Sequence, residues 1–251
     1  MEGDSKTLLI TGGSRGIGAA CALLGAEAGY RVAVNYVSNQ DAAAKIVAEI
    51  EAMDGEAFAV QGDVSDEADV LAMFEAVDRH WRRLDAFINN AGVVDVATRV
   101  DQMSAERLER MFRINLTGSF LCAREAVKRM STKHGGDGGA IVNLSSVAAT
   151  IASPNQYVDY AAAKAGVDVM TKGLALEVAE EGIRVNAVRP GIIDTEIHAS
   201  GGQPDRVARL RSVVPMKREG SPEEVAQTIL WLLSDEASYI TGAVLDVTGG
   251  R

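Results

Sequence analysis

Short apolar runs rich in β-branched residues alternate with longer helical stretches along the whole chain, and this alternation restricts the fold more than any other feature. Repeated βαβ units form a parallel sheet with right-handed crossovers and helices on both faces. We therefore expect residues 1–251 to form a single α/β domain, a doubly wound parallel sheet of about seven strands. The expected strands are Lys6–Ile10, Arg31–Val37, Ala57–Gln61, Ala86–Asn89, Ala140–Leu144, Arg184–Val188 and Ala243–Val247.

Charge and cysteine content exclude several classes of function. The net charge of −10, from 25 basic and 35 acidic residues, argues against nucleic acid or an anionic membrane as the main partner. The two cysteines, Cys21 and Cys122, lie in expected helices and are interpreted as small buried apolar residues rather than as a disulfide framework. No secretory signal and no apolar run of the roughly 20 residues that span a bilayer is present, so we expect a cytoplasmic protein.

A glycine-rich turn joins the first expected strand to the helical run Ala19–Ala28. Its glycines are Gly12, Gly16 and Gly18. Glycines allow the backbone to turn tightly and to approach a pyrophosphate, and a helix N-terminus offers free N–H groups and the positive end of its dipole. This position at a strand–turn–helix junction indicates a Rossmann-type dinucleotide site.

The spacing of these glycines resembles the first turn of the short-chain dehydrogenase/reductase family, Thr-Gly-x-x-x-Gly-x-Gly. The sequence is similar overall to sugar (glucose) dehydrogenase-like and 3-oxoacyl-[acyl-carrier-protein] reductase-like members of this family. Further family motifs follow in order over residues 6–250. They are Asp63-Val64, Asn89-Asn90-Ala91-Gly92, Asn115, Ser145-Ser146, the pair Tyr160 and Lys164, and Pro190-Gly191 with Thr195.

The resemblance implies hydride transfer between a nicotinamide cofactor and an alcohol/carbonyl pair, with catalytic residues Asn115, Ser146, Tyr160 and Lys164. A free phenol has a pKa near ~10, and a nearby cation favours tyrosinate. Lys164, one helical turn from Tyr160, is therefore expected to lower the pKa of its hydroxyl together with an oxidised nicotinamide ring. Ser146 would donate to the substrate oxygen and Asn115 would complete a proton relay.

The serine departs from the usual family spacing. Many members place it 13 residues before the tyrosine, whereas Ser146 precedes Tyr160 by 14. We interpret this as one extra residue in the segment 148–159, because Val147 in the strict register has no hydroxyl. Ser145 is the alternative.

The second strand predicts the type of nicotinamide cofactor. An NAD-selective pocket usually ends this strand with an acid, whereas here Asn35, Tyr36 and Ser38 precede Asp41, which is expected to cap the next helix. Arg15 in the glycine turn could bind a 2′-phosphate through its bidentate fork. We therefore expect NADP(H), with NAD as the alternative and a solvated Arg15 as the competing interpretation.

The resemblance also assigns cofactor contacts and a substrate segment. Residues 192–215 correspond to the family's substrate lid, in which Arg206, Arg209 and Arg211 are expected to form a solvated helix face, with an anionic or polyol substrate as their alternative ligand. His198 is interpreted as a polar lid residue, and no metal site is expected. The expected cofactor contacts are Gly12, Ser14, Arg15, Gly16, Ile17, Gly18, Asn35, Tyr36, Asp63, Val64, Asn90, Ala91, Gly92, Tyr160, Lys164, Pro190, Gly191, Ile193 and Thr195.

Taken together, these features predict an NADP(H)-dependent oxidoreductase acting on a small secondary alcohol, sugar hydroxyl or carbonyl. The alternative is a catalytically idle NAD(P)-binding regulatory or interaction protein, which the retained Tyr160 and Lys164 disfavour. The helices around 104–130 and 160–180 resemble the faces that build family tetramers, so a homotetramer is expected.

Overall fold

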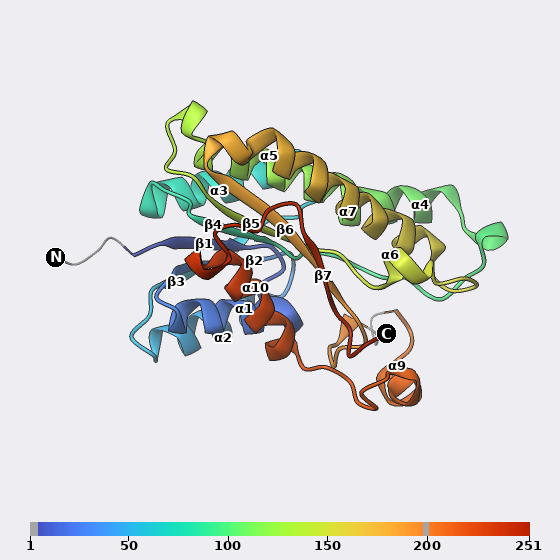
Figure 1. Cartoon of the computed structure of the whole chain (residues 1–251). Coiled ribbons are helices and arrows are strands. Elements are labelled where there is room, and N and C mark those ends of the chain that lie inside the picture. The colour runs from blue at the N-terminus through green and yellow to red at the C-terminus, as the bar shows by residue number, and fades with distance from the viewer. Residues whose placement is uncertain (1–4, 198–200) are drawn as a thin grey trace.

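The computed structural model describes residues 5–197 and 201–251, which form one seven-stranded parallel sheet with helices on both faces (Figure 1). The strand order is β3-β2-β1-β4-β5-β6-β7. The expected fold class is therefore confirmed, and each strand begins and ends within two residues of its predicted position. The strands are β1 (Thr7–Ile10), β2 (Arg31–Tyr36), β3 (Ala57–Gln61), β4 (Ala86–Asn89), β5 (Gly139–Leu144), β6 (Ile183–Pro190) and β7 (Val244–Val247).

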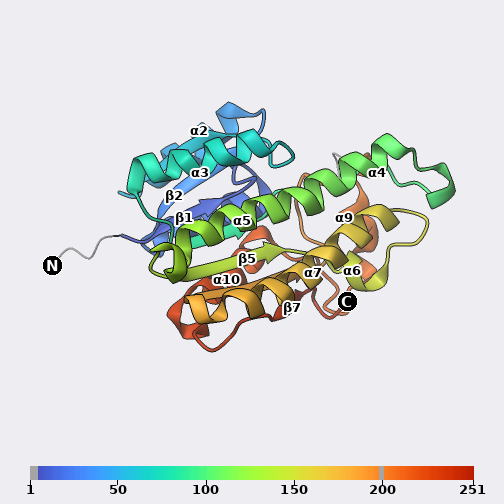
Figure 2. The same cartoon turned by 90° about the horizontal axis from the view of Figure 1, so that it is seen from above.

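The helices cover the sheet in two layers, which Figures 1 and 2 show from two directions. On one face lie α1 (Gly16–Glu27), α2 (Gln40–Glu51) and α10 (Pro222–Leu233). On the other lie α3 (Glu67–Trp81), α5 (Gly118–Met130) and α7 (Val158–Val178). The shorter helices are α4 (Ala105–Phe112), α6 (Ala148–Ile151) and α9 (Arg206–Leu210).

The apolar alternation within each strand divides the core between these two layers. In β1, Leu8 and Ile10 pack against the layer of α1, α2 and α10, whereas Leu9 faces the layer of α3, α5 and α7. All three side chains are fully buried, as expected for a strand covered on both faces. No helix among the described residues is long and apolar enough to cross a membrane.

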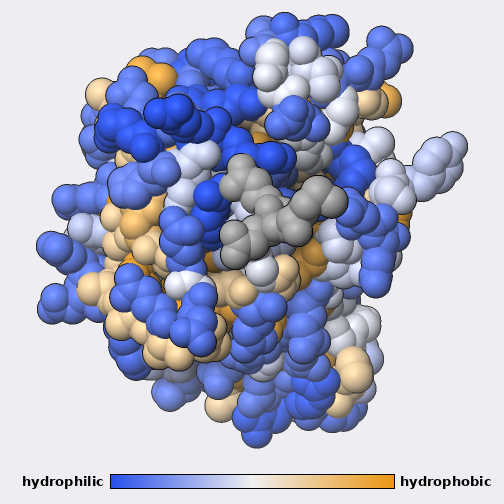
Figure 3. Space-filling view, turned by 90° about the vertical axis from the view of Figure 1, so that its left-hand side faces the viewer, coloured by the Kyte–Doolittle hydropathy of each residue, from blue (hydrophilic) through white to orange (hydrophobic). Residues whose placement is uncertain are grey.

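The order of the strands reverses at β1, which lies between β2 and β4. In open α/β sheets, ligands bind beyond the carboxyl ends of the strands at such a switch point. The segments beyond those ends include α6, α9 and the C-terminus, all at the right of Figure 1. Figure 3 shows the opposite side of the molecule, which hydrophilic residues mostly cover.

One helix begins differently from its prediction. Asn39, not Asp41, caps α2, because its side-chain oxygen accepts a hydrogen bond from the Ala42 amide at 3.0 Å. Asp41 lies inside the first turn instead, where its charge interacts favourably with the positive end of the helix dipole. Asn39 directly precedes the first residue of α2, so its side chain is the one that reaches the free amides of the first turn.

Candidate active site

The glycine-rich turn leads into the uncapped N-terminus of α1. Arg15 occupies the capping position with an extended backbone and makes no side-chain capping bond, and the first turn contains no acid. The amides at the start of α1 therefore remain available to a ligand. In α2, α3, α4 and α10, by contrast, a side chain caps the first turn.

Glycine is required at two positions of this turn for different reasons. Gly12 has φ +62°, a left-handed conformation that side chains disfavour. A Cβ on Gly18 would lie 2.3 Å from the carbonyl oxygen of Gly12, so the turn and the helix could not pack as closely.

Two polar side chains hold this turn against the end of β4: Thr11, to which the sequence analysis gave no role, and Asn90, which was expected to contact the cofactor. The Thr11 hydroxyl accepts from the Asn90 and Ala91 amides at 2.9 and 3.0 Å. The Asn90 amide group donates in return to the carbonyls of Thr11 and Gly12, at 2.8 and 3.0 Å. Thr11 opens the glycine motif, so its place in the motif was the signal that could have identified it.

Asn35 does not face the cofactor, contrary to the expectation. Its side chain is 1% exposed; its oxygen accepts from the Gly12 amide at 3.0 Å and its nitrogen donates to the Gly62 carbonyl at 2.9 Å. The reason is that Asn35 fills the space between the glycine turn and the end of β3, where unpaired backbone groups need partners. Arg15, by contrast, is exposed.

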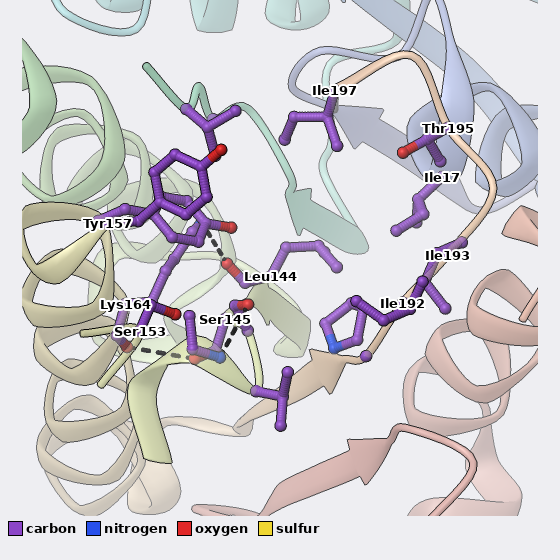
Figure 4. A pocket seen from close by; sticks show the side chains of 18 of the residues that line it. Ile17, Leu144, Ser145, Ser153, Tyr157, Lys164, Ile192, Ile193, Thr195 and Ile197 are labelled. Carbon is purple, nitrogen blue, oxygen red and sulfur yellow. Dashed lines mark hydrogen bonds between the residues drawn. The ribbon is translucent and has the colours of Figure 1, made fainter. Parts of the chain in front are cut away.

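A pocket beyond the carboxyl ends of β4, β5 and β6 brings together ten of the predicted residues. Figure 4 shows Ser145 and Lys164 on one side of it and Ile193 and Thr195 on the other. The predicted residues in its lining are Ile17, Asn90, Gly92, Ser146, Tyr160, Lys164, Pro190, Gly191, Ile193 and Thr195. Those outside its lining are Gly12, Ser14, Arg15, Gly16, Gly18, Asn35, Tyr36, Asp63, Val64, Ala91 and Asn115.

Lys164 is fixed at the base of the pocket. Its ammonium donates to the Leu144 carbonyl at 2.7 Å, and its side chain is almost fully buried. Pairing between β4 and β5 ends at Asn89 and Asn143, one residue before Leu144, which is still paired with Val188 of β6. Burial lowers the pKa of Lys164 to about 8, and the nearby Asp168 carboxylate partly opposes this change.

Lys164 does not lower the pKa of Tyr160 in the protein without its cofactor, so this part of the expectation is wrong. Burial raises the pKa of Tyr160 to about 12, and only a hydrogen bond from the Ser146 hydroxyl opposes it. The Lys164 nitrogen lies 5.7 Å from the centre of the Tyr160 ring and donates to the Leu144 carbonyl. Desolvation therefore outweighs the attraction between the two groups.

The two serines at the end of β5 point in different directions. Ser146 lines the pocket with Tyr160 and lowers the pKa of its hydroxyl, whereas the Ser145 hydroxyl donates to the Lys164 carbonyl at 3.2 Å. The structure thus favours Ser146 over Ser145 as the serine beside the tyrosine. The longer connection to Tyr160 contains α6 and then Ala152 and Ser153 with φ of 57° and 44°, a left-handed bend made by non-glycine residues.

Asn115 lies behind Gly92, in a π-helical turn at Arg113–Thr117 between α4 and α5. Its side chain accepts from the Val93 amide and donates to the Val93 carbonyl, both at 3.0 Å. A Cβ on Gly92 would lie 2.8 Å from the Asn115 side-chain oxygen and 3.4 Å from the Lys164 nitrogen. Glycine thus brings the asparagine close to the lysine. Such π-helical turns frequently occur at functional sites.

The substrate segment contributes Ile192, Ile193, Thr195, Ile197 and Arg206 to the pocket. The expectation that all three arginines form a solvated face is therefore wrong for Arg206, while Arg209 and Arg211 are exposed as expected. Arg206 differs from the other two arginines because its guanidinium packs over the ring of Tyr157, which is not one of the motif residues. His198 lies outside the described residues.

Comparison with known proteins identifies the family. A family model described as enoyl-(acyl carrier protein) reductase matches residues 12–251. The chain is 57% identical over 243 residues to an uncharacterized oxidoreductase, YgfF, of Escherichia coli, covering 97% of this chain and 98% of that protein. It is 39% identical over 245 residues to glucose 1-dehydrogenase 2 of Bacillus subtilis, covering 98% and 94%.

A solved structure adds the cofactor class. The crystal structure of 3-ketoacyl-(acyl-carrier-protein) reductase from Brucella melitensis complexed with NADH superposes with a TM-score of 0.90 at 32% identity, covering 98% of each chain. These relatives are named as an oxidoreductase and a dehydrogenase, which does not favour the alternative of a catalytically idle NAD(P)-binding protein. The glycine turn, the pocket and these relatives agree, and the chain belongs to the short-chain dehydrogenase/reductase family as an NAD(P)-dependent oxidoreductase.

Proposed function

We propose that this protein uses NADP(H) to interconvert a secondary alcohol and a carbonyl compound, with Tyr160 as the acid/base. The observation that carries the proposal is the arrangement of Ser146, Tyr160 and Lys164 in one pocket. The serine and the tyrosine line the same cavity, the serine lowers the pKa of the phenol, and the lysine is fixed by the Leu144 carbonyl beside the tyrosine ring.

The residues at the start of α1 fit a dinucleotide. Free amides at Gly16, Ile17 and Gly18 face the end of the sheet where the strand order reverses, and a pyrophosphate would satisfy them. Ile17 also lines the pocket, so the helix start and the tyrosine share one cavity. A nicotinamide held between them would supply or accept the hydride at the substrate carbon.

Tyr160 would move the proton at the substrate oxygen. In reduction its hydroxyl donates a proton to the carbonyl oxygen as the carbon gains the hydride, and the resulting tyrosinate is stabilised by the Ser146 hydroxyl and the Lys164 ammonium. Lowering its pKa from about 12 to about 7 requires about 7 kcal/mol. Lys164 alone does not provide this free energy, so we infer that the positive charge of an oxidised cofactor contributes the rest of the stabilisation of the tyrosinate.

Lys164 and Asn115 would return the proton to Tyr160. A pKa of about 8 allows Lys164 to gain and lose a proton near neutral pH. Asn115 lies next to it across Gly92, and the π-helical turn places its backbone outside the regular α-helical pattern. A water on that backbone would connect the lysine to solvent.

The proposed preference for NADP(H) rests on Arg15 and the end of β2. Arg15 is exposed beside the turn and forms no ion pair within the described part of the chain, and the residues that follow β2, Val37 and Ser38, carry no negative charge. A carboxylate there would repel a 2′-phosphate, whereas a guanidinium binds one.

Two measurements test the function. Side-by-side fluorescence titrations with NADPH and NADH should show NADPH binding at least tenfold tighter; equal or tighter NADH binding would overturn the cofactor preference. Cofactor oxidation at 340 nm with a panel of ketones should show turnover, and its absence with every ketone and both cofactors would contradict the proposed chemistry.

We also propose a cytoplasmic homotetramer. Exposed apolar residues on α5 and α7 support an interface: Phe120 is 51% exposed, Val169 71% and Leu176 84%. The free, buried Cys21 and Cys122 are consistent with a reducing compartment. A monomeric mass by light scattering would contradict the assembly.

A further inference from the structure

The substrate end of the pocket combines apolar walls with an excess of positive charge. Its described lining contains three cations, Lys164, Arg206 and Arg251, and no aspartate or glutamate. This contrasts with a net charge of −10 for the whole chain. A cleft lined by one sign of charge concentrates ligands of the opposite sign.

Among residues 5–197 and 201–251, uncharged groups hold Arg206 in place. Its guanidinium lies over the Tyr157 ring at 5.0 Å, a cation–π arrangement. One terminal nitrogen, Nη1, donates to the side-chain oxygens of Gln156 and Gln203, at 2.6 and 3.3 Å. Gln203 in turn donates to the Tyr157 hydroxyl at 2.6 Å, so amides and a ring fix the cation from several sides.

The remaining edge of this guanidinium is free within the described residues. Nε and Nη2 form no hydrogen bond there and face no carboxylate, although both lie on a side chain that is half-buried at the pocket. These two N–H groups are parallel donors, the geometry that binds the two oxygens of a carboxylate.

Apolar residues outnumber the uncharged polar ones, such as Ser146 and Ser153, in the lining of the pocket. They include Val94, Val147, Ala148, Ile151 and Ile197, and Figure 4 shows Ile197 and Tyr157 on opposite sides of the cavity. A polyol such as a sugar would lose hydrogen bonds to water against such walls. A hydrocarbon chain would not.

We propose that Arg206 is the specificity-determining residue of this pocket and that the substrate is an oxo acid or hydroxy acid, whose carboxylate binds Nε and Nη2 while its hydrocarbon part lies against the apolar walls. Arg251 adds a second positive charge at the same end. This inference rests on the proposed function, because it places the substrate carbonyl at Tyr160.

The test compares acids with uncharged esters of the same skeleton. The substrates are 4-oxopentanoate, 5-oxohexanoate and 6-oxoheptanoate, each with its methyl ester, because the series varies the distance between carbonyl and carboxylate. We expect kcat/KM to be at least tenfold higher for the acid at one or more chain lengths. Arg206→Gln should remove that preference by weakening the acids at least tenfold and the esters less than threefold.

Arg211→Gln is the matched control. It removes the same charge five residues along the chain, from a half-exposed side chain that pairs with Glu219 and does not line the pocket. It should keep the preference for acids. Esters equal to or better than acids at every length, or a preference that survives in Arg206→Gln, would overturn the proposal.

Binding separates this proposal from the proposed chemistry. Calorimetry on Tyr160→Phe protein saturated with NADPH measures the Kd of each acid and ester without turnover. Acids at least tenfold tighter than esters, with the difference lost in Tyr160→Phe/Arg206→Gln, would support the carboxylate site even if no compound is reduced. Equal Kd values for acids and esters would refute it even if ketones are reduced.

Discussion

Lys164→Met should make the protein inactive and, at neutral pH, more stable. Burial lowers the pKa of the Lys164 ammonium from 10.5 to about 8, which corresponds to a cost of about 3 kcal/mol for keeping it charged in the folded state. Methionine has a similar length and no charge. It loses the hydrogen bond to the Leu144 carbonyl, at about 1 kcal/mol. The free energy of unfolding at pH 7 should therefore rise by about 2 kcal/mol.

The pH dependence makes this prediction sharper. The unfolded chain holds the lysine proton up to pH 10.5 and the folded protein only up to about 8, so unfolding takes up a proton between these values. The Lys164 contribution to stability therefore rises with pH across this window in the unmodified protein and is absent from the variant. The advantage of Lys164→Met should be full below pH 8, vanish near about pH 9.5 and become a deficit of about 1 kcal/mol by about pH 10.5, where only the lost hydrogen bond remains.

Urea denaturation at pH 7, 8, 9 and 10 measures the difference. Lys172→Met is the control, because Lys172 lies exposed on the same helix and should show no such pH-dependent difference. A variant less stable than the unmodified protein at pH 7, or a difference that stays constant with pH, would refute the assignment of Lys164 as a strained buried cation.

Three further changes test the cofactor turn and the segment before Tyr160. Arg15→Ala should weaken NADPH at least tenfold, about 1.4 kcal/mol, and NADH less than threefold by fluorescence titration; equal losses would indicate a purely structural arginine. Thr11→Val leaves the Asn90 and Ala91 amides without their acceptor and should cost about 2–4 kcal/mol in urea unfolding, and a loss below 1 kcal/mol would argue against this role. Ala152→Gly relieves a left-handed conformation with φ 57° and should add about 1 kcal/mol of stability, and a decrease would contradict that strain.

The sequence predicted the sheet and the pocket because both depend on local patterns. β1 is an uninterrupted apolar run whose residues Leu8, Leu9 and Ile10 are all fully buried, as expected for a strand covered on both faces, and its boundaries follow from the run itself. The motif order likewise predicted that Tyr160, Lys164 and Ser146 would share one cavity, since each follows or faces the carboxyl end of a neighbouring strand.

The errors concern contacts between distant segments, which no local pattern encodes. Asn35 was expected at the cofactor, but its partners are Gly12 and Gly62, brought beside it by the pairing of three strands. Arg206 was expected in solvent, but it packs on Tyr157, 49 positions earlier in the chain. The Tyr160 pKa depends on how completely its neighbours exclude water, which the spacing to Lys164 does not determine.

The most direct test of the central claim is the rate of NADPH oxidation by Tyr160→Phe, measured at 340 nm with the best ketone of the panel. The phenylalanine keeps the ring beside Lys164 and removes only the hydroxyl. We expect NADPH affinity within threefold of the unmodified protein and a loss of at least a thousandfold in kcat, because the variant lacks the hydroxyl proposed to donate the proton to the substrate oxygen. Turnover within tenfold of the unmodified rate would contradict the assignment of Tyr160 as the acid/base.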